Sequence, residues 1–292
     1  MIKSMTGFGR SELIDENRKI TVELKSVNHR YLDVNIRMPK KLNFFDASLR
    51  GVLKKYATRG KVDIFISYED FSENTAVLKY NEQLAREYMN YYEKIGHDFA
   101  IKNDITVMSL AKSPEVLVME EKTVDEEELW MFLDKVFEAA CSKFVESRVV
   151  EGEHLKNDII DKLNGMLKYV DFIEERAPLI IEEYKKKLEE KTREFLENAQ
   201  IDDGRIAAEV ILYADKVCVD EETVRLRSHI EKMISELKAG GDVGRKLDFV
   251  AQEMNREANT ILSKSSDIEI TNVGIDLKTE IEKIREQIQN IE

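Results

Sequence analysis

The chain has 292 residues, with 45 Lys and Arg against 58 Asp and Glu, and therefore a formal net charge of −13 at pH 7. Hydrophobic residues make up 42% and charged residues 35%, with only 3 Pro and 12 Gly. This composition is typical of an ordered, helix-rich globular protein and excludes the disordered and fibrous classes. The length predicts two domains, or one domain with a long elaboration.

Nothing in the sequence indicates export or a membrane. The first ten residues lack the continuous apolar core of a signal peptide, and no apolar run is long enough to span a bilayer. The two cysteines, Cys141 and Cys218, lie far apart and match neither zinc nor thioredoxin spacing. We therefore expect buried thiols in a reducing compartment, and a cytoplasmic protein.

Charge is unevenly distributed along the chain. Residues 1–61 hold 14 Lys and Arg against 6 Asp and Glu, whereas residues 62–292 hold 31 against 52. A basic segment beside an acidic body fits a protein that attracts an anion and brings carboxylates, or a metal held by carboxylates, up to it. Alternatively, the two oppositely charged surfaces pair with each other or with a neighbouring subunit.

The N-terminal part predicts strands. Apolar and polar residues alternate over 20–24, 32–36 and 62–66, which indicates half-buried, mostly antiparallel strands. Between the second and third of these, apolar residues in 43–57 recur at helical spacing. We therefore expect a small sheet crossed by one helix in a basic N-terminal domain over residues 1–75.

From about Asn81 onward, helical periodicity dominates. Pro114 and Pro178 are the expected breaks, and Pro178 suits the opening of a new helix. The acidic run at 125–128 suits a first helical turn. The charged stretch 180–198 is typical of a long solvated helix. Residues 76–200 are accordingly expected to form a helical middle region.

The C-terminal part, residues 201–292, predicts further long helices after a boundary at Asp202-Asp203-Gly204. Asp220 is a suitable N-cap for one helix, and residues 245–264 form the next. Five apolar side chains then alternate at spacings of four and three, as in a coiled-coil seam that needs a partner helix: Leu277, Ile281, Ile284, Ile288 and Ile291. The predicted fold class is α+β, a small N-terminal sheet with a helix followed by a large helical region.

The helix over 245–264 has an unusual polar face. Opposite its apolar side lie directional hydrogen-bonding groups rather than the usual Lys and Glu, together with Lys264 on one flank: Asp248, Gln252, Asn255, Arg256 and Asn259. Amides and a guanidinium on one face can bind phosphates, riboses or base edges. The alternative is a buried polar network between helices or subunits.

Carboxylates accompany this face. Glu253 and Glu257 are four residues apart, where like charges cost roughly 0.2–0.5 kcal/mol unless a cation lies between them. With Asp248 they are candidate ligands for Mg²⁺ or Mn²⁺, although such pairs are common on ordinary helices. On the preceding helix, Glu222, Arg225 and His229 project along one edge, which is suited to general acid and base chemistry.

The basic N-terminal segment offers further candidates for binding phosphate, namely Lys3, Arg10, Asn28 and Arg30. Backbone amides near two glycines in residues 4–10 can assist, and Phe8 or Tyr31 can stack on a base. A tight strand start and a hairpin bend explain these two motifs about as well. The sequence has no P-loop, no paired CxxC and no GxSxG, which disfavours NTPase, zinc and serine-hydrolase functions.

Several motifs together resemble the bacterial YicC/YloC family. They are SMTGFGR at residues 4–10, SVNHRYLD at 26–33, TRGKV at 58–62, the stretch 151–158, GRKLDFVAQEMNREANTI at 244–261, and IREQIQNIE at 284–292. The resemblance covers the whole chain, although residues 71–147 carry little of it. It implies a divalent-metal-dependent endoribonuclease that acts on single-stranded or hairpin RNA, including small regulatory RNA, and assembles as a ring-like hexamer.

Three hypotheses follow. In the first, the chain is a metal-assisted endoribonuclease in which His229 is the general acid or base, attack on phosphorus coming from a metal-bound hydroxide or from the 2′-hydroxyl. The roles expected in it are catalysis by His229, Glu222, Glu253 and Glu257; metal binding by Asp248, Glu253 and Glu257; and RNA binding by Lys3, Arg10, Asn28, Arg30, Arg225, Gln252, Asn255, Arg256, Asn259 and Lys264. In the second, the chain is a noncatalytic RNA-binding or adaptor protein. In the third, it is a helical scaffold whose polar network joins subunits.

Overall fold

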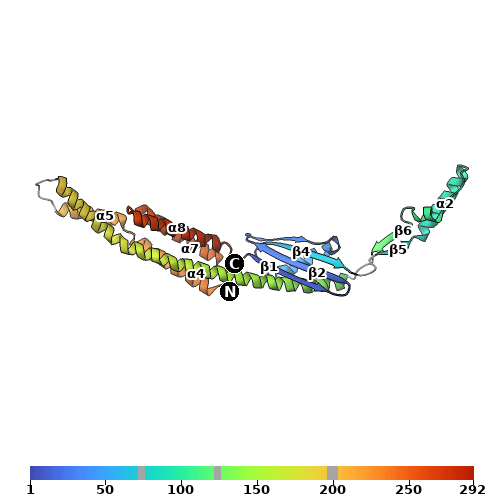
Figure 1. The fold of residues 1–292 in the computed structure, drawn as a ribbon, viewed down its shortest axis with the longest axis horizontal. Helices are drawn as coiled ribbons and strands as arrows, with labels where there is room; N and C mark the ends of the chain where they lie inside the picture. Colours follow the sequence, from blue (N-terminus) through green and yellow to red (C-terminus); the bar gives the residue numbers. More distant parts are fainter. Residues whose placement is uncertain (72–75, 122–125, 196–202) are drawn as a thin grey trace.

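The structure is a computed structural model that describes residues 1–71, 76–121, 126–195 and 203–292. It is elongated, and one long helix, α4 (Glu126–Phe195), runs beside both the N-terminal sheet and the C-terminal helices (Figure 1). None of the described helices is long and apolar enough to cross a membrane. The α+β fold class predicted from the sequence is confirmed.

The N-terminal sheet has four strands in the order β1-β2-β4-β3. Its strands are β1 (Gly7–Ile14), β2 (Arg18–Val27), β3 (Leu32–Arg37) and β4 (Gly60–Asp70). The three predicted alternating segments form β2, β3 and β4, but β3 pairs parallel to β4, so the sheet is mixed. The reason is the crossover between them, η1 (Lys40–Phe45) and α1 (Asp46–Leu53), which returns the chain in the same direction.

The predicted break at Pro178 is wrong. α4 is a continuous helix of 70 residues with Pro178 inside it. A proline in a helix interior removes one backbone hydrogen bond and costs about 3 kcal/mol. The flanking Ala177 and Ile180 both pack against the C-terminal core, and that packing holds the helix through the proline.

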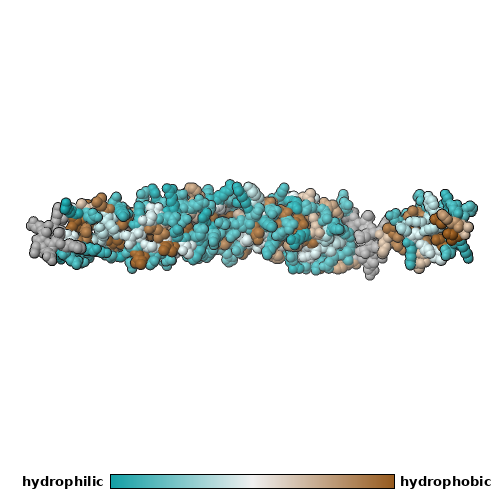
Figure 2. All heavy atoms as spheres, turned by 90° about the horizontal axis from the view of Figure 1, so that it is seen from above, coloured by the Kyte–Doolittle hydropathy of each residue, from teal (hydrophilic) through white to brown (hydrophobic). Residues whose placement is uncertain are grey.

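The predicted all-helical middle region is also wrong in part. A small tip module consists of β5 (Ala76–Tyr80), α2 (Glu82–Asp98), α3 (Val107–Ala111) and β6 (Leu117–Glu121), with β5 and β6 antiparallel. It lies at one end of the molecule, where Figure 2 shows brown, hydrophobic side chains at the surface. Ala85, Ser113 and Val116 are the buried residues that the structure describes in it.

The C-terminal helices are α5 (Asp203–Val217), α6 (Asp220–Ala239), α7 (Gly244–Lys264) and α8 (Ile268–Ile288). The predicted helix over 245–264 is confirmed as α7. The five residues of the predicted apolar seam are all buried in the core shared by α4, α6, α7 and α8. Asp220 is the first residue of α6 and Val219 its N-cap, one position from the prediction, and no side chain caps this helix end.

The two parts of the molecule meet at the ends of the chain. Lys3 N donates to Glu292 O at 3.1 Å, and Glu292 N donates to Lys3 O at 2.8 Å. Beneath them Arg148 of α4, only 1% exposed, donates from Nε to Ser4 O at 2.5 Å and pairs through Nη2 with Glu292. Gly152 lets the N-terminal segment approach α4, since a Cβ there would lie 2.4 Å from Ile2 O.

Replacing Arg148 by Met should therefore destabilise the whole molecule. The substitution leaves the Glu292 carboxylate, whose side chain is 12% exposed, without its cation, and we expect a loss of about 3 kcal/mol in the free energy of unfolding measured in urea. Arg86→Met in the exposed Arg86–Glu82 pair of the tip is the matched control and should leave stability unchanged. Equal stability of the two variants would contradict this role for Arg148.

Candidate functional site

Two ion pairs set the register of the α6–α7 hairpin. Near its turn, Lys246 Nζ lies 3.4 Å from Glu236 Oε2, and at its open end Lys264 Nζ lies 2.8 Å from Glu222 Oε1. Lys264 also donates to the backbone carbonyl of Cys218 at 3.0 Å. The sides of α6 and α7 that carry these four charged residues therefore face each other.

The predicted catalytic residues lie on this same seam. His229 is seven residues from both Glu222 and Glu236, while Glu253 follows Lys246 by seven and Glu257 precedes Lys264 by seven. Seven residues are about two helical turns, so each of the three side chains shares the side of its helix that the ion pairs occupy. The antiparallel register places His229 midway along α6, opposite the stretch of α7 that holds Glu253 and Glu257.

Two of the seam carboxylates are buried. Glu222 is 6% and Glu257 5% exposed, whereas His229 and Glu253 are half-buried. Oε2 of Glu222 is buried without a hydrogen-bond partner, and for Glu257 no hydrogen bond or ion pair is recorded among the described residues. Burying a carboxylate without full compensation is costly, so these positions are unfavourable for stability and are candidates for a functional role.

The structure does not bring Asp248 together with Glu253 and Glu257. Asp248 accepts from Gln252 Nε2 at 2.8 Å and from Arg285 Nε of α8 at 3.3 Å, so it faces α8 rather than α6. Among the residues that the structure describes, no three His, Cys, Asp or Glu side chains lie close enough to hold a metal ion. The predicted ligand set is thus divided between two sides of α7.

The solvent-facing side of α7 forms a continuous ridge. Its side chains recur at spacings of four and three and are all exposed: Arg245, Phe249, Gln252, Arg256, Asn259 and Ser263. Apart from the Asp248–Gln252–Arg285 contacts, the expected alternative of a buried polar network does not describe this side of α7. Asn255 is half-buried and lines a hollow of about 620 Å³ between α7 and α8.

The predicted RNA-binding cations fall into two groups. Arg10 pairs with Glu12 and Glu23, Arg225 with Glu221, and Lys264 with Glu222. For Lys3, Arg30 and Arg256 no carboxylate partner is recorded within the described ranges. Only a cation without a carboxylate partner can bind phosphate without first giving up an ion pair, so the second group is the stronger one.

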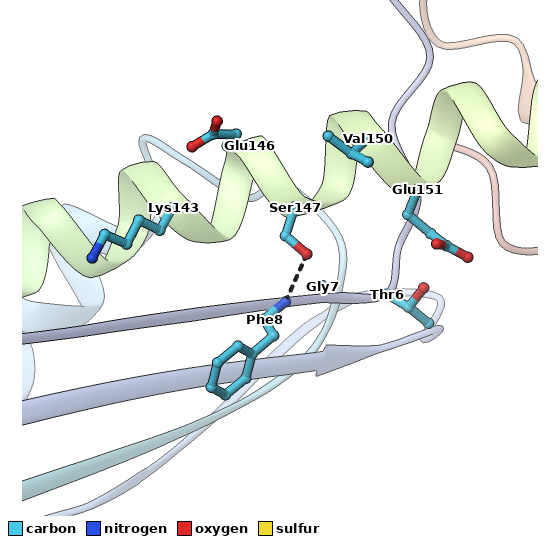
Figure 3. Close-up of a pocket in the computed structure, with 8 residues that line it drawn as sticks. All are labelled: Thr6, Gly7, Phe8, Lys143, Glu146, Ser147, Val150 and Glu151. Carbon is cyan, nitrogen blue, oxygen red and sulfur yellow. Dashed lines mark hydrogen bonds between the residues drawn. The ribbon is translucent and has the colours of Figure 1, made fainter.

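The N-terminal motif borders a hollow of about 540 Å³ between β1 and α4, lined by Thr6, Gly7, Phe8, Lys143, Glu146, Ser147, Val150 and Glu151 (Figure 3). Phe8 N donates to Ser147 Oγ at 3.4 Å. The glycines have a packing reason, because a Cβ at Gly9 would lie 2.3 Å from Ala140 O of α4. Close contact between strand and helix therefore accounts for Gly9, without phosphate binding.

The cysteines do not belong to the site. Cys141 is buried in the core between sheet and α4, and that burial raises its pKa to about 12, so its thiol is not a nucleophile near neutral pH. Cys218, expected to be buried, is instead exposed. Its backbone carbonyl contributes to the open end of the seam through Lys264.

Comparisons with known proteins agree with the resemblance. A family model described as "Endoribonuclease YicC-like, N-terminal region" matches residues 2–157, and one described as "Endoribonuclease YicC-like, C-terminal" matches residues 173–292. A "Probable endoribonuclease YicC" of Clostridioides difficile is 43% identical over 293 residues and another of Haemophilus influenzae is 34% identical over 294, each covering 100% of both chains.

The open end of the seam gives a prediction on stability. The hydrogen bond from Lys264 to Glu222 raises the pKa of Lys264, so the pair contributes fully below about pH 10.4 and is lost as the pH rises through the raised pKa. Lys264→Met leaves Glu222 buried and unpaired, and should cost about 1–2 kcal/mol near pH 7, since solvent partly screens the lysine. Urea unfolding at pH 7 and above pH 11 measures this, and an identical difference between variant and parent at both pH values would be the contrary result.

Proposed function

Because this chain belongs to the YicC-like endoribonuclease family, we propose that it cleaves phosphodiester bonds within single-stranded or hairpin RNA, small regulatory RNA included, at the α6–α7 seam. The observation that carries the assignment of the site is the seam itself. Two buried carboxylates, Glu222 and Glu257, flank the place of His229, although such burial works against stability.

Each group on the seam has chemistry that the reaction requires. An imidazole such as His229 transfers protons near neutral pH, either from the attacking hydroxyl or to the leaving oxygen. The half-buried Glu253 and the buried Glu257 can orient the imidazole or accept a proton. Arg256 on the adjoining ridge is exposed and offers a forked donor to the phosphate on either side of the cleaved bond.

A divalent metal, Mg²⁺ or Mn²⁺, is part of the proposal. The described residues do not form a site of three acidic or histidine ligands by themselves. Mg²⁺ is nevertheless commonly bound by one or two carboxylates together with substrate phosphates. Glu253 and Glu257, one helical turn apart, supply two such carboxylates, and the RNA would supply the remaining oxygen ligands.

We further propose that the chain works as a homo-oligomer, a hexamer, in the cytoplasm. Two parts of the molecule expose apolar side chains that a neighbouring copy would cover. On α5, Ile211 and Leu212 are each 67% exposed, and the tip module exposes Val107 at 87% and Met119 at 71%. Both cysteines are free thiols, which fits a reducing compartment.

The second candidate function is noncatalytic RNA binding, in which the chain acts as an adaptor in RNA turnover. The absence of a group of metal-binding ligands among the described residues favours it, since the ridge on α7 can bind RNA without any chemistry on the seam. The two functions differ in what the loss of seam carboxylates does to RNA. An adaptor would keep all its measurable properties.

Substitutions on the seam should separate the two functions. We expect His229→Gln, Glu253→Gln and Glu257→Gln each to lower the single-turnover cleavage rate of a hairpin RNA at least about 100-fold, with RNA affinity retained. Glu231→Gln is the matched control, because Glu231 lies on α6 two residues from His229 and is exposed. Cleavage by the purified protein that survives all three substitutions would exclude the seam as the active site.

The nucleophile can be identified with a modified substrate. A hairpin RNA with 2′-deoxyribose at the cleaved position should resist cleavage if the 2′-hydroxyl attacks, and should be cut if a water or metal-bound hydroxide attacks. The same assay in EDTA, followed by readdition of Mg²⁺ or Mn²⁺, measures metal dependence. Mg²⁺ should also tighten RNA binding by the parent more than by Glu253→Gln, a difference that equal tightening would refute.

A further inference from the structure

We propose that the junction between the sheet and the C-terminal helices is a second RNA site, which binds the sugar-phosphate backbone and one base of a single strand. The junction site consists of Arg30, Tyr31, Arg59 and Arg245, with Lys3 and Lys61 beside them. The inference rests on the proposed function for its ligand, but it assigns residues away from the seam.

The ends of the chain bring these residues together. Thr58, next to Arg59, donates from Oγ1 to the side chain of Glu292. Gly244, next to Arg245, touches the preceding residue, since a Cβ there would lie 2.7 Å from Ile291 O. Lys3 is hydrogen-bonded to Glu292 through its backbone, so residues from three distant segments adjoin the last two residues of the chain.

Two of the arginines are held directly against each other's loop. Arg59 Nε donates to the backbone carbonyl of Arg30 at 3.4 Å, and the Arg30 guanidinium lies 5.2 Å from the centre of the Tyr31 ring. His29 steadies this loop through its Nδ1, 2.9 Å from Tyr31 O. Tyr31 is 64% exposed, so one face of its ring remains open to a base while the cation rests on the ring.

These cations lack acidic partners in a chain that has an excess of acids. Most arginines pair with carboxylates: Arg10, Arg18, Arg50, Arg86, Arg148, Arg176, Arg225, Arg227 and Arg285. For Arg30, Arg59 and Arg245 no such pair is recorded in the described parts of the chain. With 58 Asp and Glu available, cations held apart from carboxylates in one place indicate an external anion.

The nearest acids do not neutralise the site. The Glu292 carboxylate is taken by Arg148 and Thr58 and its side chain is 12% exposed. Asp33 lies opposite Lys61 in the sheet register and offsets that lysine, which leaves the three arginines as the main contacts for phosphate. Arginine, with its planar fork, suits phosphate oxygens better than lysine does.

The junction site is continuous with the ridge on α7. Arg245 is the first residue of that ridge, which continues through Phe249, Gln252 and Arg256 at the spacing of one helical side. From Arg245 to Arg256 the helix rises about 16 Å, a span of two to three nucleotides in an extended strand. A strand anchored at the junction would therefore follow α7 and pass beside the seam.

Binding of a 12-nucleotide 2′-O-methyl oligouridylate, which resists attack by its own 2′-hydroxyl, tests the site by fluorescence anisotropy. We expect Arg30→Ala and Arg245→Ala each to weaken binding roughly tenfold and to lower the slope of log K against log salt by about 0.7. Tyr31→Ala should weaken binding roughly tenfold, whereas Tyr31→Phe should restore it. Arg86→Ala, which removes the same charge from an exposed position in the tip, should leave affinity and slope unchanged.

The outcomes separate this inference from the nuclease proposal. If Arg30→Ala and Arg245→Ala bind and respond to salt like Arg86→Ala, the junction site is overturned even where the parent cleaves RNA. If the parent binds the oligonucleotide with the expected losses but cleaves no RNA, the junction site stands and the nuclease proposal fails. Loss of affinity in Tyr31→Phe equal to that in Tyr31→Ala would overturn the stacking role.

Discussion

The buried ion pair between Arg148 and Glu292 is the interaction on which the rest of the structure depends. It joins the middle of α4 to the end of the chain, and the same arginine holds the N-terminal segment through Ser4. An ion pair so fully removed from water is tolerated only when its partners satisfy each other, so the two chain ends and α4 are held in one arrangement. The sheet, the α6–α7 turn and the loop at Arg30 are all positioned relative to that point.

The single helix α4 carries both cores. Its first part packs on the sheet and its second part on the C-terminal helices, so the basic and the acidic halves of the chain lie end to end (Figure 1). Their charges therefore do not cancel across a common face. Cations without acidic partners gather where the halves meet, and carboxylates lie on the α6–α7 seam a few helical turns away. An anionic strand is attracted to one part and reaches the other.

The seam shows stability given up locally. Glu222 keeps one buried oxygen without a partner, and Glu257 is buried with no recorded partner in the described residues, although α6 and α7 are otherwise joined by a regular apolar core. Apolar side chains at these two positions would pack as well and avoid the desolvation of charge. The ion pairs at the two ends of the seam hold the register around these unfavourable groups, so the functional part can be strained without loosening the hairpin.

The sequence by itself determined the local periodicities: the strands β2, β3 and β4, the sides of α7, and the apolar stripe of α8. These follow from neighbours along the chain, which is why Gln252, Arg256 and Asn259 were placed correctly on one exposed side. Only the tertiary structure decided that Pro178 lies within a helix, that β3 runs parallel to β4, and that β5 and β6 pair. It also decided that Asp248 faces Arg285 rather than the seam, that Arg10 is paired while Arg30 is not, and that Arg59 and Arg245 adjoin the same chain end. These depend on contacts between residues distant in sequence, and no local period contains them.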